Sequence, residues 1–259
     1  MTLSEAFLLG LLQGLTEFLP VSSSGHLALG QALLGIQTGD VTFEIIVHFG
    51  TLLAVVTALR ARISALIVGC FQRDRDAWRM VFLLLVGTIP AAVMGVLFKD
   101  MLEVAFASPV AVSGFLIATG CILWSTRFAR GDRQEITFTD AMLMGLAQAL
   151  AVLPGISRSG STITMGLWRG LDGREAATFS FLLSIPIILG ATVLALGDLM
   201  AHPPKWQALQ GLIIGAVVAY VSGVFAIRWL LGVVRGGRFA QFAYYCWLVG
   251  LVGLGYFGG

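Results

Sequence analysis

The stretch Gln13-Gly-Leu-Thr-Glu-Phe-Leu-Pro-Val-Ser-Ser-Ser-Gly-His26 decides how this chain is expected to fold. A helix-like run ends at Leu-Pro, a turn rich in serine and glycine follows, and a second apolar run begins after it. A second stretch, Gln148 to Gly160, has the same order of features. Non-helical backbone at membrane depth survives only when it is buried in protein or lines a wet cavity. We therefore expect residues 1–40 and 136–172 each to form a re-entrant helical hairpin, with one ordinary kinked span each as the alternative.

The composition places both hairpins in a membrane. Hydrophobic residues make up 58% of the 259 residues and charged residues only 12%, whereas a soluble domain carries roughly 25% charged residues. The chain therefore lacks the charge to cover a water-facing surface, and its formal net charge of +2 argues against a strongly basic nucleic-acid-binding protein. The three widely spaced cysteines predict neither a disulfide framework nor a paired metal site.

Charge-free windows predict the membrane crossings. Six such windows contain between 15 and 23 residues, and a helix needs about 20 residues to cross the hydrocarbon core. The predicted fold is an all-α polytopic membrane protein with six transmembrane helices plus the two re-entrant hairpins. The windows lie between Glu44 and Arg60, Arg79 and Lys99, Glu103 and Arg127, Glu175 and Asp198, Lys205 and Arg228, and after Arg238.

Basic residues orient this arrangement. If both hairpins return to the side from which they enter, one side holds thirteen arginines, with Arg158 set aside, and the other holds only Lys99 and Lys205. Cytoplasmic loops of membrane proteins are enriched in Lys and Arg. We therefore expect both termini outside the cytoplasm, the first hairpin entering from outside and the second from the cytoplasm. The arginine-rich side comprises residues 60–79, 127–175 and 228–238.

The two halves of the chain resemble each other. In both hairpins a glutamine, Gln13 or Gln148, precedes the glycine of the Ser-Gly turn by 12 positions, and three predicted crossings follow. An odd number of crossings per half turns the second half over. We therefore predict an inverted-topology repeat with halves 1–127 and 136–259 in a single membrane domain. Such folds place interrupted helices from both halves near the midplane, where the site lies.

The first hairpin carries candidate acid–base and nucleophilic groups. Gln13 and Glu17 are four residues apart and share one helix face, and an ionisable residue within a membrane segment is costly enough to indicate a function. A rim position for Glu17 and a packing role for His26 are the structural alternatives. Glu44 and His48 in the first crossing are weaker candidates. The turn after the helix supplies hydroxyls, a glycine and an imidazole: Ser22, Ser23, Ser24, Gly25 and His26.

The second hairpin carries a candidate anion-binding group, Arg158. It has 17 uncharged residues before it, back to Asp140, and no acidic neighbour in sequence. Its planar fork of donors suits phosphate oxygens, and nearby hydroxyls and backbone N–H groups can complete an anion nest. A purely structural ion pair between Arg158 and Glu17 is the alternative. The neighbouring candidates are Ser157, Ser159, Gly160 and Thr162.

These two motifs resemble those of a known family. The stretch from Gln13 to His26 is similar to the first signature of the undecaprenyl-diphosphatase family, also called bacitracin-resistance proteins. Pro154-Gly-Ile-Ser-Arg-Ser-Gly-Ser-Thr162 is similar to its second, a Pro-Gly-x-Ser-Arg-Ser-x-x-Thr pattern. The length, the apolar remainder and the order of the motifs agree from end to end. The first signature carries Glu or Gln four residues before a Glu, and the glutamine variant here leaves Glu17 as its only acidic group.

The resemblance implies hydrolysis of undecaprenyl diphosphate to undecaprenyl phosphate in a bacterial inner membrane, with the site facing the periplasm. The lipid carrier is thereby recycled for cell-wall peptidoglycan synthesis, which confers resistance to bacitracin. Arg158 would hold the diphosphate, Ser23 or His26 would attack phosphorus, and Glu17 would orient or deprotonate the nucleophile. Gln13 and the remaining turn residues would bind substrate. No dedicated metal cage is visible, although a divalent cation, Mg²⁺ or Ca²⁺, could bridge Glu17 and the diphosphate. A long-chain prenyl diphosphate is the expected partner, and a homodimer stays open.

Two other classes of protein compete with this interpretation. Type-2 phosphatidic-acid phosphatases also use Ser-Gly-His and Ser-Arg elements, but this chain lacks their lysine–arginine-proline motif and a histidine at a usable distance after Ser157-Arg158. A transporter or lipid flippase would share the broken helices and inverted repeat. Anion binding alone does not need the hydroxyls, the histidine and the carboxylate that this chain carries, so hydrolysis is favoured. A combined role in hydrolysis and lipid movement stays open.

Overall fold

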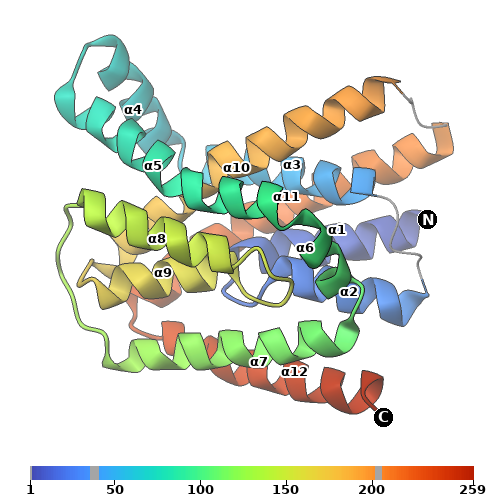
Figure 1. The fold of residues 1–259 in the computed structure, drawn as a ribbon. Coiled ribbons are helices and arrows are strands. Elements are labelled where there is room, and N and C mark those ends of the chain that lie inside the picture. Colours follow the sequence, from blue (N-terminus) through green and yellow to red (C-terminus); the bar gives the residue numbers. More distant parts are fainter. Residues whose placement is uncertain (1, 36–40, 202–205) are drawn as a thin grey trace.

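The computed structural model describes residues 2–35, 41–201 and 206–259, and over these ranges the chain is helical, with no extended strand (Figure 1). Residues 36–40 of the predicted first hairpin and Lys205, which bounds a predicted crossing, lie outside these ranges. The α-helices are α1 (Leu3–Phe18), α2 (Ser23–Leu34), α3 (Val41–Ala58), α4 (Arg60–Phe71), α5 (Arg75–Leu97), α6 (Lys99–Phe106), α7 (Pro109–Ser125), α8 (Phe138–Leu150), α9 (Arg158–Trp168), α10 (Gly173–Ala201), α11 (Trp206–Arg235) and α12 (Phe242–Phe257), with 3-10 turns at Thr126–Phe128 and Phe239–Gln241.

The first predicted break is present between α1 and α2. A capping box at Thr2 and Glu5 begins α1. Its end follows from Pro20, because a residue before proline is pushed out of the helical region, and Leu19 is extended. Ser22 caps α2, which ends at Gly35 in the left-handed conformation that favours glycine. The chain thus forms two antiparallel helices joined by a short turn (Figure 1).

The second predicted break has the same helix caps, but its first helix does not extend to Leu-Pro as expected, since α8 ends at Leu150, four residues before Pro154. Thr137 and Asp140 form a capping box at the start of α8, and Ser157 caps α9. Within each turn the serine Oγ accepts a hydrogen bond from a glycine N–H three residues later: Ser22 from Gly25 at 3.3 Å and Ser157 from Gly160 at 3.0 Å. The Ser-x-Ser-Gly sequence shared by the two turns therefore makes the same capping hydrogen bond in both.

Among the described residues, five helices are long and apolar enough to cross a membrane. They correspond to α5, to α7 with its following turn, to α10, to α11, and to α12 with its preceding turn. The crossing predicted between Glu44 and Arg60 coincides with α3, which bends by 77° into α4 at Leu59. This bent pair is the sixth apolar segment, so the fold is that of an all-helical, multi-pass membrane protein.

Helices of the two halves of the chain interleave. Helix α1 packs along α11, α5 along α8, α7 along α12, and α3 against both α10 and α11. Glycines allow close contact between α1 and α11, since a Cβ on Gly10 would lie 2.5 Å from the Gly215 carbonyl oxygen. This interleaving brings the tips of the two hairpins together in the interior (Figure 1).

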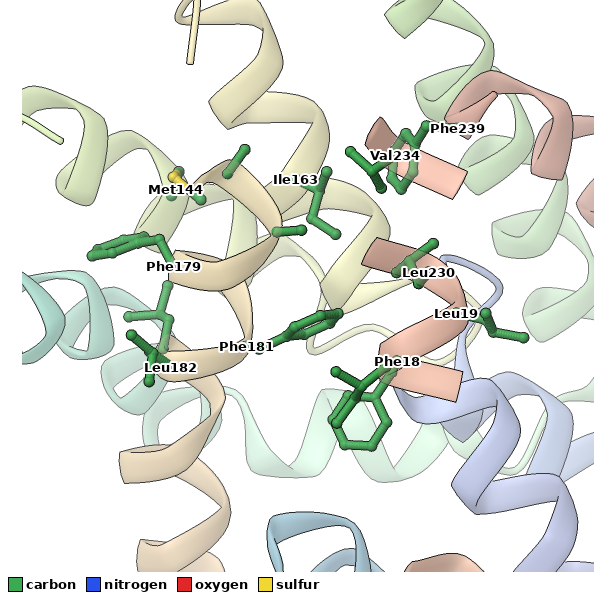
Figure 2. Packing of buried hydrophobic residues seen from close by; sticks show 14 of the residues in the cluster. Phe18, Leu19, Met144, Ile163, Phe179, Phe181, Leu182, Leu230, Val234 and Phe239 are labelled. Atoms are coloured by element: carbon green, nitrogen blue, oxygen red, sulfur yellow. The ribbon is translucent and has the colours of Figure 1, made fainter. Parts of the chain in front are cut away.

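A buried apolar cluster supports the hairpin tips (Figure 2). Phe18, at the end of α1, meets Phe181 of α10 edge to face, with ring centroids 5.6 Å apart. Ile163 of α9 and Leu230 of α11 belong to the same cluster. Phe18 follows Glu17 and Phe181 follows Ser180, so this packing fixes the backbone beside two polar groups of the candidate site.

A charged cluster anchors the far end of the second hairpin. The Asp140 carboxylate is fully buried and accepts hydrogen bonds from Arg133 Nη1 at 2.7 Å and from Arg169 Nε at 2.9 Å. Thr137 donates to it through its backbone N–H and its hydroxyl, at 2.9 and 2.7 Å. Because a buried carboxylate is stable only when it is paired, this cluster ties the segment before α8 to the end of α9.

Candidate functional site

The tips of the two hairpins are in direct contact. The Gly155 N–H donates to Ser22 Oγ at 3.1 Å, and Ser159 Oγ donates to the Leu19 carbonyl at 3.1 Å. Two glycines permit this approach: a Cβ on Gly25 would lie 2.9 Å from Gly155 Cα, and Gly155 itself has a φ of +100°. Residues 19–25 of the first hairpin are therefore in contact with residues 155–159 of the second.

Glu17 lies at the centre of this contact. Its Oε1 accepts from Arg158 Nη2 at 2.6 Å, and its Oε2 accepts from Ser23 Oγ at 2.5 Å. Gln13 Nε2 donates to the same Oε2 at 3.1 Å. The residue is only 8% exposed, and the cost of burying an ion requires such compensation. The contact predicted between Arg158 and Glu17 is confirmed, and the same carboxylate also holds a serine hydroxyl.

Ser23 and Arg158 occupy the same position in their helices. Each is the first residue after a capping serine, in α2 and α9 respectively. The first turn of a helix carries a partial positive charge and attracts anions. Two helix N-termini and one guanidinium therefore converge on Ser23 and Glu17, so the electrostatics of the site favour a negatively charged group beside the Ser23 hydroxyl.

The backbone of the first turn is strained at Ser22. Its φ of 69° and ψ of 98° are unusual for a residue with a side chain, and such conformations cost about 1–3 kcal/mol. Several bonds hold it there. Its Oγ accepts from the N–H groups of Gly25 and Gly155 and lies 3.3 Å from Ser24 Oγ, and its carbonyl accepts from His26. Strain of this kind, next to the Ser23 hydroxyl, is typical of a functional site.

His26 is buried but lies in a different set of contacts from Glu17. Its Nδ1 is 2.8 Å from the Ser22 carbonyl oxygen, and its Nε2 is 2.9 Å from the hydroxyl of Tyr245. Both ring nitrogens are thus occupied by protein groups. No sequence pattern points to Tyr245, which is 219 positions away on α12 and resembles any other aromatic residue in a membrane helix.

The other predicted residues of the second hairpin bond within the protein. Ser157 Oγ caps α9, and Ser159 Oγ reaches the Leu19 carbonyl. Thr162 is fully buried, and its hydroxyl contacts the Arg158 carbonyl at 2.8 Å and Ser180 Oγ at 2.6 Å. These side chains hold the turn and the backbone of Arg158 in place.

Two further residues, His48 and Thr119, contact the candidate site. His48, a weaker candidate in the sequence, places Nε2 3.5 Å from Glu17 Oε2, while its Nδ1 bonds the Glu44 carbonyl at 2.7 Å. Thr119 was not predicted. Its hydroxyl donates to the Gly155 carbonyl at 2.7 Å and accepts from the Ser157 N–H at 3.0 Å, so α7 fixes the second turn.

The described residues supply only some of the ligands that a bound cation needs. Over the described ranges, no group of three or more histidine, cysteine or acidic side chains is placed to hold a metal. Gln13 Oε1, beside Glu17, is buried and has no hydrogen-bond partner in the described part of the chain. Its Nε2 must be the atom facing Glu17, since a carboxylate only accepts, so Oε1 is left as a free oxygen ligand.

These features define a class of protein: a multi-pass helical membrane protein with a serine hydroxyl, a carboxylate and an arginine converging at two helix starts. A hydroxyl within hydrogen-bond reach of a basic group, here a carboxylate, is an arrangement that can activate a nucleophile. An arginine with helix N-termini is typical of phosphate-oxygen binding.

Comparison with known proteins agrees with this class. Residues 6–252 match the family model described as bacitracin resistance protein BacA, and the chain belongs to this family. It is 43% identical to an undecaprenyl-diphosphatase of Desulfatibacillum aliphaticivorans, with 95% of each chain covered. It is 44% identical to one of Salinibacter ruber, covering 98% of this chain and 99% of the relative. The family indicated by the two sequence motifs is thereby confirmed.

Proposed function

We propose that this protein is an integral-membrane phosphatase that hydrolyses undecaprenyl diphosphate to undecaprenyl phosphate and inorganic phosphate, and so confers resistance to bacitracin. The observation that carries the proposal is the bridge made by Glu17, which holds the Ser23 hydroxyl on one oxygen and the Arg158 guanidinium on the other. The name carried by relatives along their whole length supports it.

Ser23 is the nucleophile in this proposal. Its Oγ attacks the terminal phosphorus while its proton passes to Glu17 Oε2, 2.5 Å away. The bond from that phosphorus to the bridging oxygen breaks, and undecaprenyl phosphate leaves with the electron pair. Water then attacks the phosphoserine, Glu17 returns the proton to Ser23 Oγ, and inorganic phosphate is released.

Arg158 binds diphosphate oxygens and stabilises the charge on the transferred group. Its Nη1 lies 3.4 Å from the Ser180 carbonyl, and its Nη2 bonds Glu17. His26 is the weaker candidate for nucleophile, because an attack would first require one ring nitrogen to leave the Ser22 carbonyl or the Tyr245 hydroxyl.

A divalent cation, Mg²⁺ or Ca²⁺, fits beside these groups. Glu17 and the free Gln13 Oε1 supply oxygen ligands of the kind such cations prefer, and diphosphate oxygens would complete the shell. When bound, the cation would neutralise part of the diphosphate charge.

The membrane arrangement in this proposal has six crossings and two re-entrant hairpins. The bent pair α3–α4 is the first crossing, and the halves 1–127 and 136–259 form an inverted repeat. The matching turns at Ser22 and Ser157 and the reciprocal pairs α1–α11 and α8–α5 support the repeat. The arginine distribution supports a site facing the periplasm of a bacterial inner membrane.

The decisive experiment compares Ser23→Ala with Ser64→Ala in purified, detergent-solubilised protein. Phosphate release from undecaprenyl diphosphate is measured with and without a chelator. Ser64 is exposed near the start of α4, where its hydroxyl donates to the Ala61 carbonyl, so Ser64→Ala is the matched control. We expect Ser23→Ala to lose activity by a hundredfold or more and the control to remain active. Substantial activity in Ser23→Ala would move the nucleophile to His26, and absence of phosphate release from the native protein would favour a pure lipid transporter.

A further inference from the structure

The hydroxyl of Tyr245 is the end of a hydrogen-bonded chain that leads to the nucleophilic turn. Tyr245 on α12 contacts His26 Nε2 at 2.9 Å, and His26 Nδ1 contacts the Ser22 carbonyl at 2.8 Å. The two rings are nearly parallel, at 9°, with centroids 5.5 Å apart. We infer that Tyr245 is a positioning residue for the phosphatase reaction, acting through His26 to hold the Ser22–Ser23 turn. This inference rests on the proposed function, with Ser23 as nucleophile.

The direction of each hydrogen bond follows from the chemistry of the groups. A carbonyl oxygen only accepts, so His26 Nδ1 carries the hydrogen that bonds Ser22. In the neutral imidazole, Nε2 is then the acceptor, and the Tyr245 hydroxyl donates to it. Removing the Tyr245 hydroxyl leaves His26 Nε2, a buried acceptor, without a partner and frees the His26 ring to rotate.

The turn that carries Ser23 is the one that needs such support. Ser22 has a φ of 69°, whereas the matching residue of the second hairpin, Ser157, has an ordinary φ of −75°. Four residues after Ser157 stands Ser161, whose backbone N–H bonds the Ser157 carbonyl at 2.8 Å. At the equivalent place after Ser22 stands His26, which bonds the Ser22 carbonyl through both its backbone N–H and its ring. The extra ring contact therefore occurs at the strained turn.

Helix α12 reaches the same turn a second time. Cys246, next to Tyr245 in the chain, is fully buried and places Sγ 3.6 Å from the Pro20 carbonyl oxygen. Pro20 and Ser22 flank the single residue Val21, so Cys246 contacts one side of the turn directly and Tyr245 reaches the other side through His26. The position of Ser23 Oγ against Glu17 thus depends on how α12 packs.

The test compares Tyr245→Phe, which removes one oxygen atom, with the control Tyr244→Phe. Tyr244 is exposed, and its ring packs against Trp124. We measure kcat and KM for undecaprenyl diphosphate, together with the thermal unfolding temperature in detergent. A misplaced nucleophile slows chemistry without weakening diphosphate binding, so Tyr245→Phe should lower kcat by about 10- to 100-fold with KM changed by no more than about twofold. The control should match the native enzyme, and Tyr245→Phe should stay folded, with an unfolding temperature lower by only a few degrees because one buried acceptor loses its partner.

A double-mutant comparison separates this role from a general packing role. If Tyr245 acts through His26, adding Tyr245→Phe to His26→Ala should cause no further loss of kcat. Native kcat in Tyr245→Phe, or full additivity with His26→Ala, would overturn the inference while leaving Ser23 and Glu17 in place. Activity in Ser23→Ala would instead overturn the proposed nucleophile, and the inference with it.

Discussion

Arg158→Lys is the sharpest test of the second hairpin, because it preserves the charge and changes only its geometry. In the native protein Nη2 bonds Glu17 Oε1 at 2.6 Å while Nη1 reaches toward the Ser180 carbonyl at 3.4 Å. A lysine ammonium is a compact point charge. It can neutralise Glu17 or contact a phosphate oxygen, but it cannot reproduce the planar, two-pronged grip of a guanidinium on a diphosphate.

The expected loss follows from the role of that grip. Removing one preorganised donor to the transition state typically costs about a hundredfold or more, on the order of 3 kcal/mol. Because the lost contact strengthens as charge develops, the loss should appear in kcat as well as in KM. The assay is phosphate release from undecaprenyl diphosphate in detergent, with Arg174→Lys, an exposed arginine at the start of α10, as control.

The competing explanation for Arg158 is a structural ion pair with Glu17. A lysine would satisfy that pair, so the variant would then release phosphate at a near-normal rate. Such a result would refute the catalytic assignment of the second hairpin. We expect instead a folded, monodisperse and nearly inactive protein.

Two further predictions concern topology and the anchor of the second hairpin. Single cysteines placed at Thr2 and Gly259 should react with a membrane-impermeant reagent added outside intact cells. A single cysteine at Asp74 should not react, because the arginine-rich side faces the cytoplasm. Labelling at Asp74 alone would reverse the orientation. Asp140→Asn should lower the thermal unfolding temperature, since Arg133 and Arg169 lose their buried partner, a loss of about 1–3 kcal/mol with both arginines partly exposed. Its remaining folded fraction should keep native KM, and a changed KM would show that the cluster reaches the substrate site.

Much of the fold was predictable from local sequence. Pro20 predicted the end of α1, because proline restricts the residue before it, and the serines of both Ser-Gly turns predicted the caps of the helices that follow. Pro154 predicted a second break, but α8 already ends at Leu150, four residues before that proline. Charge-free windows predicted the long apolar helices. The 77° bend between α3 and α4 was not predicted, because the charge-free window ends at Arg60 and marks the end of an apolar run without fixing the direction of the chain beyond it.

The contacts of the candidate site were likewise predictable from the sequence only in part. The contact between Glu17 and Arg158 was predictable, because each charge lies in an apolar stretch and isolated burial is too costly. The choice between Ser23 and His26 was not, because both follow the same break. The proposal of Ser23 as nucleophile rests on tertiary packing: α12 brings the Tyr245 hydroxyl to His26, while Ser23 Oγ faces Glu17. A sequence pattern encodes local backbone preference and burial, whereas the partner of a hydrogen bond 219 residues away is fixed only when the helices pack.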